Sequence, residues 1–171
     1  MEMSGSVHIA ADRQAVWDAL LNPDVLMQCV PGCQEMAGTP DDGVTATVVQ
    51  KVGPVKATFK GAVTLEDRVA PDSLRLVGEG KGGAAGFAKG GAQVQLQDVE
   101  GGTELSYTVE AKVGGKLAQL GSRIIDGFAR KMADKFFEDF RAAVGSTDAP
   151  DDPQGDEDQP KKGWLKSIVS R

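Results

Sequence analysis

Between residues 34 and 113 the chain alternates apolar and polar residues in runs that turn-forming pairs separate. A period of two places neighbouring side chains on opposite faces of a strand, so each run predicts a strand with one buried face. Turns such as Asp42-Gly43, Gly53-Pro54 and Gly101-Gly102 are too short for parallel crossovers and restrict these strands to an antiparallel meander. The predicted strands cover residues 34–37, 44–52, 55–69, 73–80, 88–99 and 103–113, after a first strand at residues 4–10.

Helices are predicted on both sides of this meander. Asp12 is a suitable N-cap for a helix that contains Trp17, Asn22-Pro23 interrupts that helix, and a second short helix covers residues 24–30. After Gly114-Gly115, apolar residues at helical spacing predict one helix of roughly thirty residues. Such a helix is long enough to cover the concave face of a curved sheet and to leave a cavity between the two layers. Its apolar stripe consists of Leu117, Leu120, Ile124, Phe128, Met132, Phe136 and Phe140.

The composition predicts a globular domain with appendages and limits its chemistry. The chain has 171 residues, of which 40% are hydrophobic, and a net charge of −6. No basic face is visible outside the C-terminal segment, which argues against a nucleic-acid partner. The N-terminus has neither the basic residues nor the apolar segment of a signal peptide, so a cytoplasmic protein is expected.

Residues for catalysis or metal binding are scarce. His8 is the only histidine, so neither a histidine-based triad nor a multi-histidine metal centre is expected, and no residue set demands catalysis. Cys29 and Cys33 are expected to be reduced thiols that pack as small hydrophobic residues. A chemical role for either cysteine would require a depressed thiol pKa.

The C-terminal residues differ in composition from the rest. Residues 147–159 are rich in aspartate and are expected to form a flexible acidic linker, which leaves residues 1–146 as the folded domain. Residues 160–171 form a basic amphipathic tail that is too short to cross a bilayer and is expected to attach weakly to a membrane surface. Docking of the tail on the domain or in a protein groove is the alternative. The expected membrane-binding residues are Lys161, Lys162, Trp164, Leu165, Lys166, Ile168 and Val169.

Four separated motifs carry a resemblance to a known family. They are CVPGC at 29–33, VGPVKATFKG at 52–61, GEGKGGAAGFAKGGA at 78–92 and VGGKLAQLGSRIIDGFARKMADKFF at 113–137. In this order they resemble the carbon monoxide dehydrogenase CoxG family of the START-like, or SRPBCC, superfamily. The resemblance implies an α+β helix-grip fold, with a curved antiparallel sheet of about seven strands wrapped around a long C-terminal helix and an internal apolar cavity.

The resemblance also implies a function. A CoxG-like chain is expected to be a non-catalytic accessory protein that recruits aerobic molybdenum CO dehydrogenase to the cytoplasmic membrane and binds a respiratory quinone, menaquinone or ubiquinone. An assembly factor for a molybdenum hydroxylase and, with less support from the residues, a cyclase-like enzyme are the alternatives. The expected cavity residues are Phe59, Leu76, Phe87, Tyr107, Leu120, Ile124, Phe128 and Met132.

Several of these residues allow a second interpretation. The apolar stripe of the long helix fits either plain core or ligand lining, and the resemblance favours lining. The glycine-rich segment at 78–91 fits either a hairpin whose turns require glycine or the mouth of a ligand site, where the ring of Phe87 would need cover. The hydroxyl of Tyr107, the only tyrosine, is expected to bind either a quinone carbonyl or an internal partner.

Overall fold

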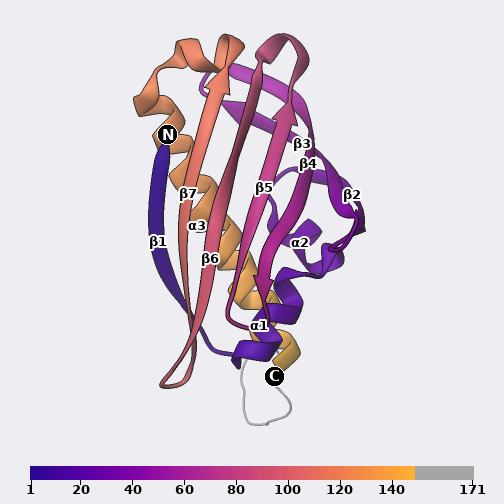
Figure 1. Cartoon of the computed structure of the whole chain (residues 1–171). Coiled ribbons are helices and arrows are strands. Elements are labelled where there is room, and N and C mark those ends of the chain that lie inside the picture. Colours follow the sequence, from indigo (N-terminus) through magenta and orange to yellow (C-terminus); the bar gives the residue numbers. More distant parts are fainter. Residues whose placement is uncertain (149–171) are drawn as a thin grey trace, which may run out of the picture.

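Residues 1–148 are described by the computed structural model, in which a curved sheet wraps around one long helix (Figure 1). All neighbouring strands are antiparallel, in the order β1-β7-β6-β5-β4-β3-β2, so the predicted meander and fold class are confirmed. The strands are β1 (Glu2–Ile9), β2 (Cys33–Thr39), β3 (Gly43–Val52), β4 (Val55–Val69), β5 (Ser73–Lys81), β6 (Phe87–Val99) and β7 (Gly102–Gly114). The helices are α1 (Arg13–Leu20), α2 (Pro23–Cys29) and α3 (Ser122–Asp148), and two 3-10 segments are η1 (Gly83–Ala85) and η2 (Gly115–Leu120).

The first two helices begin where the sequence provides N-caps. The Asp12 carboxylate accepts a hydrogen bond from the Ala15 N–H at 2.8 Å and caps α1, as predicted. The Asn22 side chain accepts from the Asp24 N–H at 3.0 Å, and Pro23 occupies the first position of α2. Figure 1 shows α1 at one end of the sheet, beside the C-terminal end of α3, and α2 following it on the side of β2.

The long helix begins later than predicted. Instead of one helix directly after Gly114-Gly115, the chain forms η2, and Gly121 then adopts φ +91° before α3 starts at Ser122. Because an α-helix requires negative φ, the positive φ of Gly121 ends the 3-10 segment, and the chain changes direction before α3. Leu117 and Leu120 therefore belong to η2 rather than to the stripe of α3.

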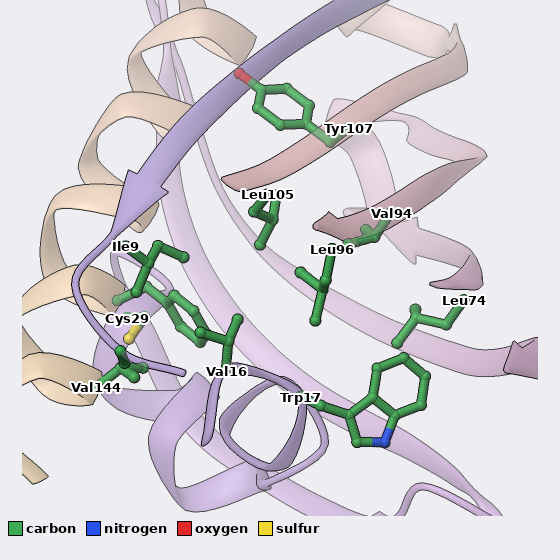
Figure 2. Packing of buried hydrophobic residues seen from close by; sticks show 12 residues of the cluster. Ile9, Val16, Trp17, Cys29, Leu74, Val94, Leu96, Leu105, Tyr107 and Val144 are labelled. Carbon is green, nitrogen blue, oxygen red and sulfur yellow. The ribbon is translucent and has the colours of Figure 1, made fainter. Parts of the chain in front are cut away.

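A packed core fills the end of the molecule that α1 closes. Trp17 of α1 lies against the inner face of the sheet near Leu74 and Leu96, and Phe140 of α3 is fully buried (Figure 2). The rings of Phe136 and Phe140 stack with centroids 5.6 Å apart. The fully or almost fully buried apolar residues include Ile9, Val16, Trp17, Cys29, Leu74, Leu105, Phe140 and Val144.

The predicted linker and tail fall almost entirely beyond this part of the chain. α3 continues to Asp148, and every expected membrane-binding residue from Lys161 to Val169 lies outside the described residues. Within residues 1–148, no helix combines the length and the apolar character that crossing a bilayer requires.

Candidate functional site

Two adjoining apolar chambers lie between the concave face of the sheet and α3. The upper chamber, at the end of the sheet next to η2, has a volume of about 460 Å³, and the lower chamber, toward α1, has a volume of about 400 Å³. Each lies in the size range of sites for small organic ligands. The residues that line both chambers, and so mark their boundary, are Met3, Val30, Val48, Val109, Ala133 and Phe136.

Missing side chains on the inner face of the sheet create much of this space. Gly61 of β4 pairs with Gly80 of β5, Gly80 pairs with Ala88 of β6, and Ala111 of β7 also lines the upper chamber, so small residues form the floor across β4 to β7. A Cβ atom on Gly80 would have no heavy atom within 4 Å. Further toward α1, the inner positions of the same strands carry large side chains, including Leu65, Leu74, Leu76, Val94, Leu96 and Leu105.

The chambers are lined almost entirely by apolar groups. No charged side chain lines either chamber, and Gln50 and Tyr107 are the only lining residues with polar side-chain atoms among residues 1–148. The Gln50 amide donates a hydrogen bond to the Pro31 carbonyl oxygen. Because a buried charge without a partner is costly, the cavity suits a neutral apolar molecule rather than an ion.

Tyr107 has internal partners for both its ring and its hydroxyl. The ring stacks on Phe137 with centroids 5.1 Å apart, and the hydroxyl oxygen accepts a hydrogen bond from the Arg130 guanidinium at 3.4 Å. The hydroxyl lies against β1, where a Cβ atom on Gly5 would be only 2.7 Å from it (Figure 2). Of the two predicted roles for this hydroxyl, the geometry therefore favours the internal partner.

The structure brings five of the eight expected cavity residues to the chambers. Phe59, Phe128 and Met132 line the upper chamber, and Leu76 and Tyr107 line the lower one.

The other three expected residues lie at the same end of the molecule but line neither chamber. Leu120 and Ile124 lie beside Gly53 in the β3–β4 turn, and Ile124 is 40% exposed. Phe87 lies over Gly114 and is 38% exposed, so the glycine-rich segment covers its ring only in part. The close approach of Gly86 to Gly114 and Gly115 shows why this segment needs glycine, because a Cβ atom on Gly86 would be 2.1 Å from the Gly114 oxygen.

The sequence prediction missed the residues at the boundary between the chambers. Val30 and Val48 belong to a predicted helix and a predicted strand, Met3 precedes the predicted first strand, and the approach of all three to α3 depends on the curvature of the sheet. Alternation would have placed Met3 and Val48 on the inner face, and Phe136 belongs to the predicted stripe. The signal for the missing side chains was also present, since Gly61 and Gly80 occupy inner strand positions rather than turns.

The two cysteines are free thiols outside the chambers. Burial raises the pKa of the Cys29 thiol, and the Asp139 carboxylate adds to the rise. Burial also raises the pKa of Cys33, whose thiol donates to the Glu35 carbonyl oxygen at 3.4 Å. A raised pKa keeps both groups protonated at neutral pH, which fits packed hydrophobic residues rather than reactive nucleophiles. No group of acidic, histidine and cysteine side chains in residues 1–148 is arranged to hold a metal ion.

Comparisons with known proteins agree with this fold. The carbon monoxide dehydrogenase CoxG family matches residues 5–145. A search of the curated proteins finds no match.

Several solved structures share the architecture. A conserved protein from Geobacillus kaustophilus is 26% identical with a TM-score of 0.80, and the alignment covers 87% of this chain and 98% of that one. An uncharacterised protein from Rhizobium leguminosarum is 15% identical with a TM-score of 0.66, over 85% of this chain and 95% of that one. A protein from Thermus thermophilus is 12% identical with a TM-score of 0.66, over 87% of this chain and 100% of that one. The last two likenesses show the fold alone.

Proposed function

Because this chain belongs to the carbon monoxide dehydrogenase CoxG family, which gives it an accessory role linked to CO dehydrogenase, we propose that it carries a respiratory quinone and recruits the enzyme to the cytoplasmic membrane. The quinone, menaquinone or ubiquinone, would occupy the two chambers. The tail at residues 160–171 would hold the protein at the bilayer.

The character of the two chambers is the observation that carries the quinone proposal. A quinone combines a neutral planar ring with a hydrocarbon chain, and two adjoining apolar chambers provide separate spaces for these parts. Each isoprenoid methylene that leaves water contributes about 0.8 kcal/mol. A charged metabolite would lose its hydration with little return, because neither chamber has a charged side chain and the Met1 ammonium group already donates to the Ala111 carbonyl oxygen at 3.0 Å.

The proposed role is binding rather than catalysis. The Gln50 amide is neither an acid nor a base, and the Tyr107 hydroxyl already accepts a hydrogen bond from Arg130, so neither polar lining residue is set up for acid-base catalysis. The chain would deliver the quinone as an electron acceptor, and the chemistry would take place on the dehydrogenase.

The tail supports the recruitment proposal through its sequence. Trp164, Leu165, Ile168 and Val169 have the spacing that would place them on one side of a helix, and Lys161 and Lys162 precede them. A linker of about fifteen residues spans roughly 20 Å by random-coil scaling, which allows the folded domain to move while it stays near the bilayer.

Gly80→Leu tests the cavity directly. The added side chain projects into free space of the upper chamber, so it should weaken binding of a menaquinone or ubiquinone analogue at least tenfold without loss of folding. Binding is measured by titration of the purified full chain, and mass spectrometry of its organic extract identifies any ligand that co-purifies.

Thr58→Leu is the matched control. It adds the same side chain to an exposed position of neighbouring strand β4, outside both chambers, and should leave binding unchanged. Wild-type protein that neither retains nor binds any quinone would refute the carrier proposal, and equal affinity in Gly80→Leu would refute the assignment of the cavity.

A further inference from the structure

Lysines surround the end of the sheet that holds the upper chamber and form a basic face, which corrects the expectation from the sequence that no such face lies outside the C-terminal segment. Seven of the nine lysines in residues 1–148 lie there, all of them exposed. Six of the seven are direct sequence neighbours of residues that line the upper chamber. Along the strands, successive side chains point to opposite faces, so the lining residue faces the cavity and the neighbouring lysine faces solvent. The seven lysines, which we call the lysine ring, are Lys51, Lys56, Lys60, Lys81, Lys89, Lys112 and Lys116.

The charge of the lysine ring is largely unpaired within the folded domain. Its one ion pair among the described residues joins Lys81 to Glu79 at 3.9 Å. Arg123, at the start of α3, is exposed at the same end and likewise has no carboxylate within ion-pair distance in that part of the chain. Elsewhere on the sheet, arginines are paired closely, as Arg68 with Asp41 and Arg75 with Glu110, each at 2.6 Å.

Acidic residues gather at the opposite end. The turns between β2 and β3, between β4 and β5, and between β6 and β7 carry acidic side chains, whereas the turn between β3 and β4 has lysines on both sides. The folded domain is therefore electrically polarised along the sheet, although the net charge of the chain is −6. The acidic residues of those three turns and their flanks are Asp41, Asp42, Glu66, Asp67, Asp72, Asp98, Glu100 and Glu104.

Exposed apolar side chains lie among these cations. Phe87 and Ile124 are two of the three large apolar residues that the described part of the chain leaves most exposed. Each is the immediate neighbour of a residue that lines the upper chamber, Ala88 and Ile125 respectively. The surface above this chamber thus combines basic and apolar groups, the combination that interfacial membrane-binding segments use.

We propose that this end of the folded domain, with the lysine ring around Phe87 and Ile124, docks on an anionic bilayer and turns the upper chamber toward the lipid. The use of lysine indicates a bilayer rather than an acidic protein as the partner. The hydrated point charge of lysine suits a diffuse anionic surface, whereas carboxylates in fixed positions are bound best by the planar guanidinium group of arginine. The inference deepens the proposed function and rests on a ligand that comes from the membrane. It differs from attachment by the tail because it assigns an orientation to the folded domain.

Charge reversal in the full-length chain tests this surface. A lysine beside an anionic bilayer contributes about fivefold to affinity, so Lys51→Glu/Lys116→Glu, which removes two lysines and adds two repelling carboxylates, should weaken binding to phosphatidylglycerol-containing vesicles by at least about 25-fold. The matched control, Lys131→Glu/Lys135→Glu, makes the same change in net charge on exposed positions of α3 outside the ring and should bind within about threefold of wild type. Co-sedimentation measures both affinities, with phosphatidylcholine vesicles as the reference.

The apolar side chains provide a second test. Phe87→Ser/Ile124→Ser should also weaken vesicle binding, whereas Val69→Ser, which changes an exposed apolar residue at the acidic end of β4, should not. Circular dichroism of each variant checks that the domain stays folded.

A tail variant separates this inference from the proposed function. In the full-length Trp164→Glu/Ile168→Glu protein, the remaining vesicle binding should still depend on Lys51 and Lys116. The inference would be overturned if the Lys51→Glu/Lys116→Glu protein bound anionic vesicles with wild-type affinity. It would also be overturned if this variant lost binding to CO dehydrogenase but kept its binding to vesicles. Neither result would change quinone binding, so the carrier proposal would stand. Failure to bind any quinone, with vesicle binding that still depends on the lysine ring, would instead overturn only the carrier proposal.

Discussion

Two glycines on neighbouring strands differ in their tolerance of a side chain. A Cβ atom on Gly90 would be 2.0 Å from the backbone oxygen of Glu110, whereas the same atom on Gly80 would meet nothing within 4 Å. Gly90 therefore permits the close approach of β6 and β7, and Gly80 leaves space in the upper chamber.

Alanine substitutions should separate these two roles. Gly90→Ala should lower the free energy of unfolding by about 1–3 kcal/mol, because the backbone of β7 has to move to admit the methyl group. Gly80→Ala should be neutral or should raise it by up to about 1 kcal/mol, since the unfolded chain loses freedom without a clash in the folded state. Urea denaturation of both variants measures the difference, and equal destabilisation would contradict the distinction.

Sequence patterns indicate which residues face inward, but not how far each backbone lies from its neighbour. Alternation places Tyr107 on the inner face of the sheet. It does not predict that Arg130 and Phe137 are its partners, because the pattern does not specify how α3 is rotated against the sheet. Likewise, the sequence identified a glycine-rich segment, while the structure separates glycines of the β5–β6 connection from Gly80 on the cavity floor.

At the scale of elements, Gly121 separates η2 from α3. The apolar stripe continues through this position without a change of spacing, so periodicity alone predicts one uninterrupted helix. The break depends on backbone conformation, with φ at +91°, and glycine is the residue that adopts it at low cost. The predicted strands, in contrast, agree closely with the structure because turn residues mark both of their ends.

Two alanine substitutions test this boundary. Gly121→Ala should lower the free energy of unfolding by about 1–2 kcal/mol, because a side chain disfavours this left-handed conformation. Gly127→Ala, at an exposed interior position of α3 with free space around it, should raise it by up to about 1 kcal/mol. Thermal denaturation checks the opposite signs, and stabilisation by Gly121→Ala would show that η2 and α3 prefer to form one helix.

At the scale of the whole molecule, side-chain size changes along the inner face of the sheet. Large residues around Trp17 and Leu74 pack the end near α1, and small residues such as Gly80 and Ala88 leave the other end hollow. The fold and its two layers followed from periodicity and turn chemistry. The cavity required the register between strands, because the small residues face a common space only when β4, β5 and β6 are paired.

Ligand binding should stabilise the whole domain. A quinone analogue at about 100 times its dissociation constant adds about 2.7 kcal/mol to the free energy of unfolding, which corresponds to a rise in Tm of about 5–10 °C for a domain of this size. Differential scanning calorimetry of the full chain measures this shift. Gly80→Leu should show the same Tm with and without the analogue, and an unchanged Tm in the wild type would contradict binding to the folded state.

The placement of lysines directly beside cavity-lining residues has a consequence for how the sheet assembles. A slip of one residue in the pairing of β3, β5 or β6 would exchange the two faces, and Lys51, Lys81 or Lys89 would then point into the hollow between sheet and helix. A cavity without side-chain charges offers no partner for a lysine, so every such misregistered sheet is strongly disfavoured. The alternation that gives the sheet two chemically distinct faces thus also favours the native strand register. It does so even where glycines leave the inner face without side chains whose packing could specify the pairing.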